Sequence, residues 1–210
     1  MPVIHSYQEM PAWSELKKYQ VLELLPGKTY EIQEDYPQIG IIVLSGTCNV
    51  SAGETELSLK LNDWYTTTTG RLTLQGQPYY FVEKCQVMLV CGTWEHVHLD
   101  IFRVDKFENP VNPGTACDYY RNSSFDNHYH DFDEHWIVVS GEGVAYTEGK
   151  PFEVKGGDCI VTGMGHHHDF PISHTYITAV AVETTPMGEK REGHLWEHRD
   201  GKAVPQMDRI

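Results

Sequence analysis

Short apolar runs, many of them alternating with polar residues, follow one another along the chain with turn residues between them. In the first half they predict strands at 19–25, 29–33, 40–44, 47–52, 56–59, 64–67, 71–75, 79–84 and 86–92. Turn signals such as Pro26-Gly27, Ser45-Gly46 and Asn62-Asp63 separate these runs. Long segments with the helical period of about 3.6 residues are absent. The pattern therefore predicts an all-β fold, either a sandwich or a barrel.

The second half repeats this pattern after a linker-like stretch, Asn-Pro-Val-Asn-Pro-Gly at 109–114. We expect a connecting strand at 95–108 and further strands at 117–122, 127–130, 135–139, 143–147, 152–154, 158–162 and 176–182. Residues 1–18 look like an arm, with a short helix at 13–18, that packs on a barrel or on a partner subunit. Residues 184–210 are polar and contain several glycines and prolines, so they are expected to wrap a barrel or to cover its mouth.

An internal repeat links the two halves. A shift of 95 residues places Ile-Val-Leu-Ser-Gly at 42–46 on Ile-Val-Val-Ser-Gly at 137–141, and Lys-Leu-Asn-Asp at 60–63 on Lys-Gly-Gly-Asp at 155–158. The repeat favours two barrels in tandem. The alternative is one enlarged barrel to which the first half contributes extra strands.

Charge and composition narrow the classes of partner. The formal net charge is −14, which argues against binding to nucleic-acid phosphates and to anionic membranes. A strongly anionic ligand is disfavoured unless a local positive site overrides this mean charge. The first 20 residues contain no apolar signal-peptide core, and no run approaches the roughly 18 apolar residues of a membrane helix. We expect a soluble cytoplasmic protein whose five cysteines, none in a CxxC pattern, are buried hydrophobes in a reducing compartment.

Metal-binding residue types concentrate in the second half. His128 and His130 are two residues apart, so both point to the same face of a strand. Glu134 can follow on the inward face of the next strand together with Trp136. A third histidine arrives later, in Gly-Met-Gly-His-His-His at 163–168. Three imidazoles and one carboxylate would form a mixed nitrogen and oxygen site suited to Fe, Mn, Co, Ni, Zn or Cu.

This spacing resembles the two motifs of the cupin family. From its first histidine onward, the first motif, H-x-H-x(3,4)-E-x6-G, is matched by His128, His130, Glu134 and Gly141. The second motif, G-x5-P-x-G-x2-H-x3-N, is matched by Gly157, Gly165 and His168, with Gly163 in place of the proline and Ile172 in place of the asparagine. The opening glycine of the first motif is also missing. These departures fall on turn residues, so the resemblance bears on the metal site more than on any subfamily.

The resemblance implies a cupin β-barrel, that is, a double-stranded β-helix or jelly roll. It implies one divalent transition metal (Fe, Mn, Zn, Ni or Co) held by His128, His130, Glu134 and His168. Under the repeat, the ligand positions of the first half carry Gln33, Asp35, Ile39 and Thr73. The predicted division is therefore a degenerate cupin-like barrel without metal ligands at 1–108, a metal-binding barrel at 109–185 and a C-terminal tail at 186–210.

Neighbouring residues compete for the same roles. Asp131 and Asp133 compete with the glutamate, although the spacing favours Glu134. The aspartates are expected to face solvent or to hold a ligand histidine through its second ring nitrogen. If the segment is extended, His166 shares the face of the ligand histidine, so it is a candidate to contact that ligand or to act as a general base. His167 is expected on the surface.

Candidate substrate contacts flank the motif. Arg121, next to Tyr120, is a candidate to anchor a carboxylate bidentately, and a structural salt bridge is the alternative. Trp136 and Tyr146 are candidates to line the cavity, with ordinary core packing as the alternative. Tyr146 and His166 are also the candidates to move a proton in catalysis.

His194 and His198 form a separate pair. They are four residues apart and would share one face of a helix. They either form a second metal site or are ordinary packing and solvated histidines.

The site leaves several functions open. A metal with these ligands keeps one or two open positions where adjacent oxygens of a ligand can bind. The resemblance implies an enzyme acting on a small polyoxygenated substrate, such as a sugar or a hydroxy or keto acid, of the isomerase/epimerase or dioxygenase type. The alternatives are a non-catalytic cupin that binds or senses a small ligand, and a metal that only staples the barrel. The expected partners are a small molecule and, because exposed edge strands need covering, a second copy of the chain in a homodimer.

Overall fold

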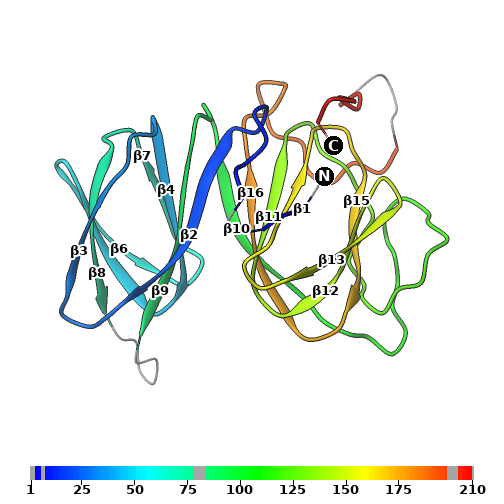
Figure 1. Ribbon diagram of the computed structural model, residues 1–210, viewed down its shortest axis with the longest axis horizontal. Helices are drawn as coiled ribbons and strands as arrows, with labels where there is room; N and C mark the ends of the chain where they lie inside the picture. Colours follow the sequence, from blue (N-terminus) through cyan, green and yellow to red (C-terminus); the bar gives the residue numbers. More distant parts are fainter. Residues whose placement is uncertain (1–2, 6–7, 78–83, 198–202, 210) are drawn as a thin grey trace. The chain divides into compact units, whose positions relative to one another are not determined.

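A computed structural model describes residues 3–5, 8–77, 84–197 and 203–209 (Figure 1). Every regular element in these ranges is a β-strand, so the protein is all-β as predicted. Within the same ranges there is no helix long and apolar enough to cross a membrane. The chain forms two compact units. The first unit is Glu15–Trp94, and the second unit is Met1–Ser14 together with Glu95–Ile210.

The first unit consists of two four-stranded antiparallel sheets. One has the order β2-β9-β4-β7 and the other β3-β8-β5-β6. The strands are β2 (Leu16–Leu24), β3 (Thr29–Gln33), β4 (Gln38–Ser45), β5 (Thr47–Ala52), β6 (Thr55–Lys60), β7 (Trp64–Thr67), β8 (Arg71–Gln77) and β9 (Cys85–Gly92). Ile41 from one sheet and Val50 and Leu74 from the other belong to a single buried cluster. Each sheet therefore turns its apolar face to a shared core, as alternating strands require.

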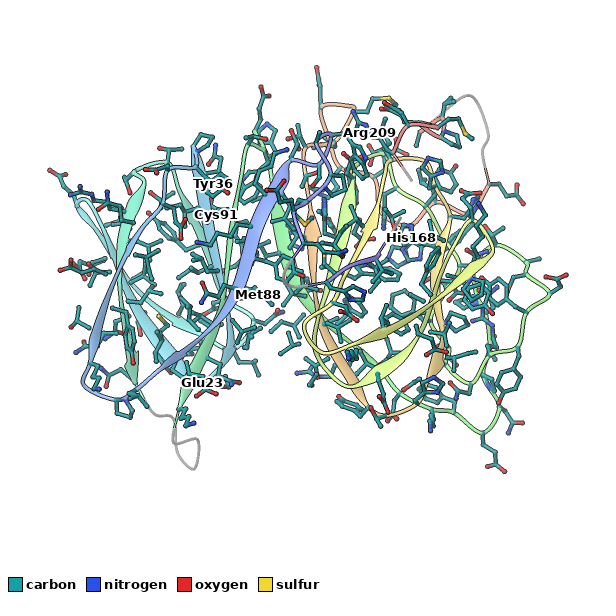
Figure 2. All side chains as sticks on the ribbon, in the orientation of Figure 1. Glu23, Tyr36, Met88, Cys91, His168 and Arg209 are labelled. Atoms are coloured by element: carbon teal, nitrogen blue, oxygen red, sulfur yellow. The ribbon has the colours of Figure 1, made fainter. Side chains whose placement is uncertain are left out.

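The second unit also has two antiparallel sheets, and His168 lies in this unit (Figure 2). Their orders are β1-β14-β11-β16-β10 and β13-β12-β15. The strands are β1 (Val3–Ile4), β10 (His98–Val104), β11 (Glu134–Ser140), β12 (Glu142–Thr147), β13 (Lys150–Lys155), β14 (Cys159–Thr162), β15 (His168–Ser173) and β16 (Ile177–Glu183). Trp136, Ala145 and Phe170 join both sheets in one core. The N-terminal arm adds a short edge strand, because β1 pairs with β14.

The internal repeat extends to the architecture. Shifting by 95 residues carries β5 onto β12, β6 onto β13 and β7 onto β14, with both ends of each strand in register. The irregularity between Val43 and Ser45 in the pairing of β4 recurs between Val138 and Ser140 in the pairing of β11. The order β2-β9-β4-β7 also corresponds to β10-β16-β11-β14. This agreement supports two barrels in tandem over one enlarged barrel. Residues 95–104, which the sequence-based division placed in the first part, group with the second unit because β10 pairs with β16 along its length.

Some predicted elements were wrong. No helix occurs at 13–18, where β2 begins at Leu16, and no strand occurs at 117–122. The predicted strand at 127–130 is reduced to isolated bridges at His128 and Tyr129. The strand β15 was missed, and it contains Pro171, a residue that argues against a strand in a sequence pattern. The Pro171 carbonyl accepts hydrogen bonds from the backbone amides of Asn122 and Ser123. The segment at 117–122 therefore reaches the edge of β15 without forming a ladder. The strand predicted at 79–84 lies almost wholly outside the described residues.

The turn between β11 and β12 generates a prediction about stability. Gly141 has a φ of 89°, and an added Cβ would collide with the backbone of Tyr176. Gly149 has a φ of 70° but open space around it. We expect Gly149→Ala to lower the free energy of unfolding by about 1 kcal/mol, the cost of the left-handed backbone alone. Gly141→Ala should lower it by about 2–4 kcal/mol, since the backbone must also move. Urea unfolding of both variants measures the difference, and equal losses would contradict the tight turn.

Candidate metal centre

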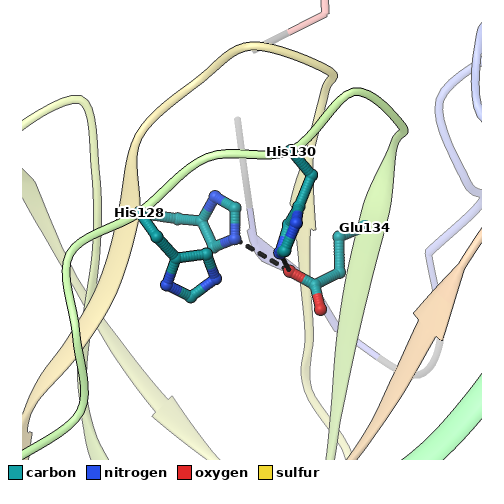
Figure 3. A group of neighbouring side chains, drawn as sticks. His128, His130 and Glu134 are labelled. Carbon is teal, nitrogen blue, oxygen red and sulfur yellow. Dashed lines mark hydrogen bonds and ion pairs between the residues drawn. The ribbon is translucent and has the colours of Figure 1, made fainter. Parts of the chain in front are cut away.

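Four buried side chains converge in the second unit. One ligand atom from each lies within 4.8 Å of the others in the group His128, His130, Glu134 and His168. Glu134 opens β11 and His168 opens β15. His128 is tied to His168 by an antiparallel bridge, with backbone N–O distances of 3.1 and 2.8 Å. Figure 3 shows His130 and Glu134 facing each other with His128 beside them. The structure therefore brings together the ligand residues that the sequence predicted.

Backbone carbonyls orient two of the imidazoles. His128 Nδ1 lies 2.9 Å from the carbonyl oxygen of Asp126, and His168 Nδ1 lies 2.9 Å from that of His166. A carbonyl only accepts, so both Nδ1 atoms carry the hydrogen and both Nε2 atoms are left for the interior. Nε2 of His168 lies 2.8 Å from Glu134 Oε2. Two atoms that both present lone pairs at this distance need a proton or a cation between them.

His130 provides the test of whether a metal fits. Both of its ring nitrogens are buried, and neither has a hydrogen-bond partner among the described residues. Nε2 approaches Glu134 Oε2 to 3.3 Å without the alignment of a hydrogen bond. A buried polar atom that stays unsatisfied destabilises the fold. A cation at the centre of the cluster would be bound by this nitrogen, and the mixed donor set suits a divalent transition metal.

Burial sets the protonation states of the cluster. It lowers the pKa of His128, His130 and His168, which keeps these imidazoles neutral near pH 7. Burial by itself would raise the pKa of Glu134, but the ring nitrogens of His130 and His168, 3.3 and 2.8 Å from its Oε2, hold that pKa well below its usual range. The group therefore combines neutral imidazoles with a carboxylate, which are the forms that ligate metal ions.

Aromatic rings enclose the ligands. Phe132 stacks on His130 with ring centroids 4.3 Å apart, and Trp136 meets His168 edge-on at 4.9 Å. Trp136 thus belongs to the core and borders the cluster, and its contact with a substrate stays a prediction. Beyond Phe132, the guanidinium of Arg191 lies over its ring at 4.4 Å and pairs with Glu183 at 3.3 Å. Burial and the nearby charge of Glu134 raise the pKa of Glu183 to about 7.

The two aspartates near the motif are buried and hold backbone turns. Asp133 accepts hydrogen bonds from the Met164 amide at 2.8 Å and from Arg209 at 2.9 and 3.0 Å. Asp131 accepts one from the Glu192 amide at 3.2 Å. The expectation that these aspartates face solvent or hold a ligand histidine was therefore wrong: both are buried, and neither bonds a ring nitrogen of His128, His130 or His168. Their hydrogen bonds fix the turn before His168 and the segment that follows β16.

Other predicted residues lie away from the cluster. His166 places its ring nitrogens 3.3 Å from Glu148 Oε1 and 2.8 Å from the Gln206 carbonyl oxygen. Tyr146 stacks on Tyr119 at 4.0 Å on the outer side of β12, since its neighbour Ala145 faces the core. Tyr120 is 72% exposed. The structure does not bring these side chains to the metal ligands.

Arg121 forms a largely buried ion pair. Its guanidinium lies 2.6 Å from Asp169, whose side chain is fully buried, and donates a hydrogen bond of 2.7 Å to the Phe125 carbonyl. The structural salt bridge is therefore the role that these contacts support. It fastens the segment that leads into His128 onto β15.

Two further residues lie at the cluster: Asp126, which the sequence did not mark, and His194, which it marked only in a pair with His198. His194 stacks on His128 with centroids 3.7 Å apart and an interplanar angle of 6°. Its Nδ1 donates to Asp126 Oδ2 at 2.7 Å. Residue 194 lies in an extended segment and not in the helix that a pairing with His198 assumed, and His198 is outside the described residues. The place of His194 beside the predicted ligands could not be foreseen, because Asp126 and His194 are far apart in sequence.

Comparisons with known proteins agree with this arrangement. A family model described as the AraC-like ligand binding domain matches residues 115–176, which contain the four candidate ligands. AerE from Microcystis aeruginosa is similar in structure with a TM-score of 0.57, at 12% identity over 82% of this chain and 88% of that one. A point mutant of Bacillus subtilis oxalate decarboxylase gives a TM-score of 0.60, at 9% identity over 86% and 71% of the two chains. An IolB-like protein from Salmonella typhimurium gives 0.55, at 13% identity over 94% and 97%. At these identities the likeness concerns the fold.

The fold is all-β and cupin-like, and its clustered histidines and glutamate form a possible metal site, as the sequence resemblance predicted. The chain belongs to the same family as "Uncharacterized protein y4oW" of Sinorhizobium fredii, with which it is 31% identical over 218 residues, covering 100% of this chain and 97% of that protein.

The cluster generates a prediction about metal content. Protein purified without added metal should carry about one equivalent of a transition metal per chain. His130→Ala should lower this content several-fold, because it removes an inward-facing donor. His167→Ala is the control, since Nε2 of this neighbouring residue lies 3.1 Å from the Thr115 hydroxyl, outside the cluster. Elemental analysis measures both variants. Unchanged content in His130→Ala would refute the site.

The Arg121 ion pair generates a prediction about stability. Arg121→Ala leaves the fully buried Asp169 carboxylate without its cation and should lower the free energy of unfolding by about 3–5 kcal/mol. The exposed Arg103 serves as control, and Arg103→Ala should change the free energy of unfolding by no more than about 0.5 kcal/mol. Metal content per folded chain should remain that of wild type. A small stability loss combined with altered ligand binding would instead favour the carboxylate-anchoring role.

Proposed function

We propose that this cupin is a metal-dependent enzyme acting on a small polyoxygenated substrate, such as a sugar or a hydroxy or keto acid. The observation that carries the proposal is the buried convergence of His128, His130, Glu134 and His168 with unsatisfied nitrogens on His130. When bound there, a divalent metal supplies Lewis-acid chemistry or, for iron, dioxygen chemistry. The reaction is of the isomerase/epimerase or dioxygenase type.

The chain's own residues would bind and enclose such a substrate. Phe132 and Trp136 keep water from two of the ligand imidazoles. Glu183 lies directly across from Glu134 in the pairing of β11 with β16, so both side chains point to the same face. At the edge of the cluster, this carboxylate offers acceptors for hydroxyl groups, and the guanidinium of Arg191 paired to it offers donors for hydroxyl and carboxylate groups.

A second candidate function is ligand binding or sensing without turnover. The match of residues 115–176 to the AraC-like ligand binding domain favours it. A sensor would use the same metal ligands to hold its small molecule, and no group that moves a proton would be needed.

We further infer that the first unit is a degenerate barrel without metal. Its counterparts of the ligands include Gln33 and Asp35, both exposed, and Ile39, which is fully buried in an apolar core. Among the described residues of this unit, no three His, Cys, Asp or Glu side chains come together as a metal-binding group.

Assays with and without oxygen separate these functions. Metal-loaded protein is incubated with sugars, hydroxy acids and keto acids, with oxalate added because one structural neighbour is named an oxalate decarboxylase. Substrate loss and product formation are followed by NMR, and binding by calorimetry. An isomerase should turn over in both atmospheres, a dioxygenase only in air, and a sensor should bind without turnover. His130→Ala should abolish either outcome, and a wild-type protein that neither binds nor converts any compound would contradict the proposal.

A further inference from the structure

We propose that His194 contacts the small molecule that occupies the open position of the metal centre, with Asp126 holding the imidazole in place. The inference rests on the proposed function, since it requires a metal centre that takes a ligand. It adds a binding residue from a part of the chain that neither motif covers.

His194 lies beside the ligand set without belonging to it. Its ring is parallel to that of His128 at 3.7 Å and perpendicular to that of His130 at 5.2 Å. The four residues whose ligand atoms lie within 4.8 Å of one another do not include it. A ring 3.7 and 5.2 Å from two ligand rings, but outside the ligand set, is placed to touch a molecule bound to the metal.

Asp126 determines which way the His194 ring points. Its Oδ2 accepts hydrogen bonds from His194 Nδ1 at 2.7 Å and from Trp196 Nε1 at 3.0 Å, while its Oδ1 lies 3.4 Å from His128 Nδ1. Both Nδ1 atoms are thus turned towards Asp126, that of His128 to its backbone carbonyl at 2.9 Å and that of His194 to its carboxylate at 2.7 Å. Their Nε2 atoms consequently project away from it on the same side. Because His128 Nε2 faces the cluster, His194 Nε2 is directed at the mouth of the cluster.

The segment around His194 is fixed to the ligand backbone. Tyr129, which lies between the two ligands His128 and His130, exchanges backbone hydrogen bonds of 2.9 and 3.0 Å with Leu195. The Tyr129 hydroxyl donates to the Glu197 carbonyl at 2.6 Å. His194 is therefore ordered relative to the metal ligands, and its side chain remains 46% exposed, which leaves an approach for a small molecule.

Two other roles for His194 are chemically different. Asp126, His128 and His194 also form a group able to hold a cation. However, imidazole lone pairs lie in the ring plane, so two rings stacked in parallel cannot both direct a nitrogen at one ion between them. The hydrogen bonds from the two Nδ1 atoms to Asp126 account for the contacts without an ion. Metal ligation by His194 is thus an outcome for the experiment to detect.

Cobalt provides the readout. Full-length protein is loaded with Co²⁺, and glycolate is titrated while the cobalt absorption bands are recorded. Because His194 Nδ1 donates to Asp126, its Nε2 keeps a lone pair that accepts a hydrogen bond from the glycolate hydroxyl. In His194→Ala, the affinity for Co²⁺ should stay within about two-fold of wild type, and the dissociation constant for glycolate should rise about five- to ten-fold, the effect of one lost hydrogen bond. His194→Gln can place its amide oxygen near the position of Nε2 and should recover part of the loss. His194→Asn keeps only the contact with Asp126 and should behave like alanine.

His174→Ala is the matched control, because this histidine is in the same unit, is also 46% exposed and pairs with Glu153 away from the cluster. It should leave both affinities unchanged. Glycolate affinity that is unaltered in His194→Ala would overturn the inference, as would the absence of glycolate binding in wild type. A loss of Co²⁺ comparable to that of His130→Ala would make His194 a metal ligand and overturn it too. Failure of wild type to bind Co²⁺ would instead reject the proposed function.

Discussion

The metal centre depends on one antiparallel bridge, the pair of backbone hydrogen bonds between His128 and His168. The segment that carries His128 and His130 is not a strand, and this bridge is what aligns it with β15. Once the bridge is formed, carbonyls of the same two segments orient the imidazoles, and Glu134 meets them from β11. The unsatisfied nitrogens of His130 are then a consequence of the alignment, and a bound cation offsets their burial.

The repeated architecture shows what distinguishes a binding barrel from a scaffold. In the first unit, β3 pairs with β8 as a regular ladder, with Gln33 at the position that corresponds to His128. In the second unit the equivalent segment forms only isolated bridges, and both His128 and His130 are buried at the cluster. At the position of Glu134 the first unit has Ile39, which packs in an apolar core. The same strand order therefore supports either a packed interior or a polar one, and the choice rests on a few inward-facing side chains.

The spacing of the ligand residues made them predictable from the sequence. Contacts between distant segments of the chain could not be predicted in this way. Glu134 and His168 open strands, whereas His128 and His130 followed from their two-residue spacing although their segment forms only isolated bridges. Most strands followed from alternation and turn residues. His166 was misplaced as a neighbour of the ligands because the turn at Gly165, with a φ of 82°, breaks the extended geometry that its prediction assumed. Tyr146 was assigned to the cavity although its neighbour Ala145 takes the inward position. Asp126 had no local signal, and the pattern around His194 pointed only to a pair with His198, since only the folded chain pairs the C-terminal segment with Tyr129.

The second unit is discontinuous in sequence, and this affects how it is made. Its edge strand β1 precedes the whole first unit, and Leu195 pairs with the backbone of Tyr129 near the far end of the chain. During synthesis on the ribosome, the first unit has all its strands once residue 94 has emerged. The second unit must wait until residue 197 is free before the ligand segment receives its last backbone partner. Metal capture is therefore expected to be a late event in the maturation of each new chain, after the first unit has already folded.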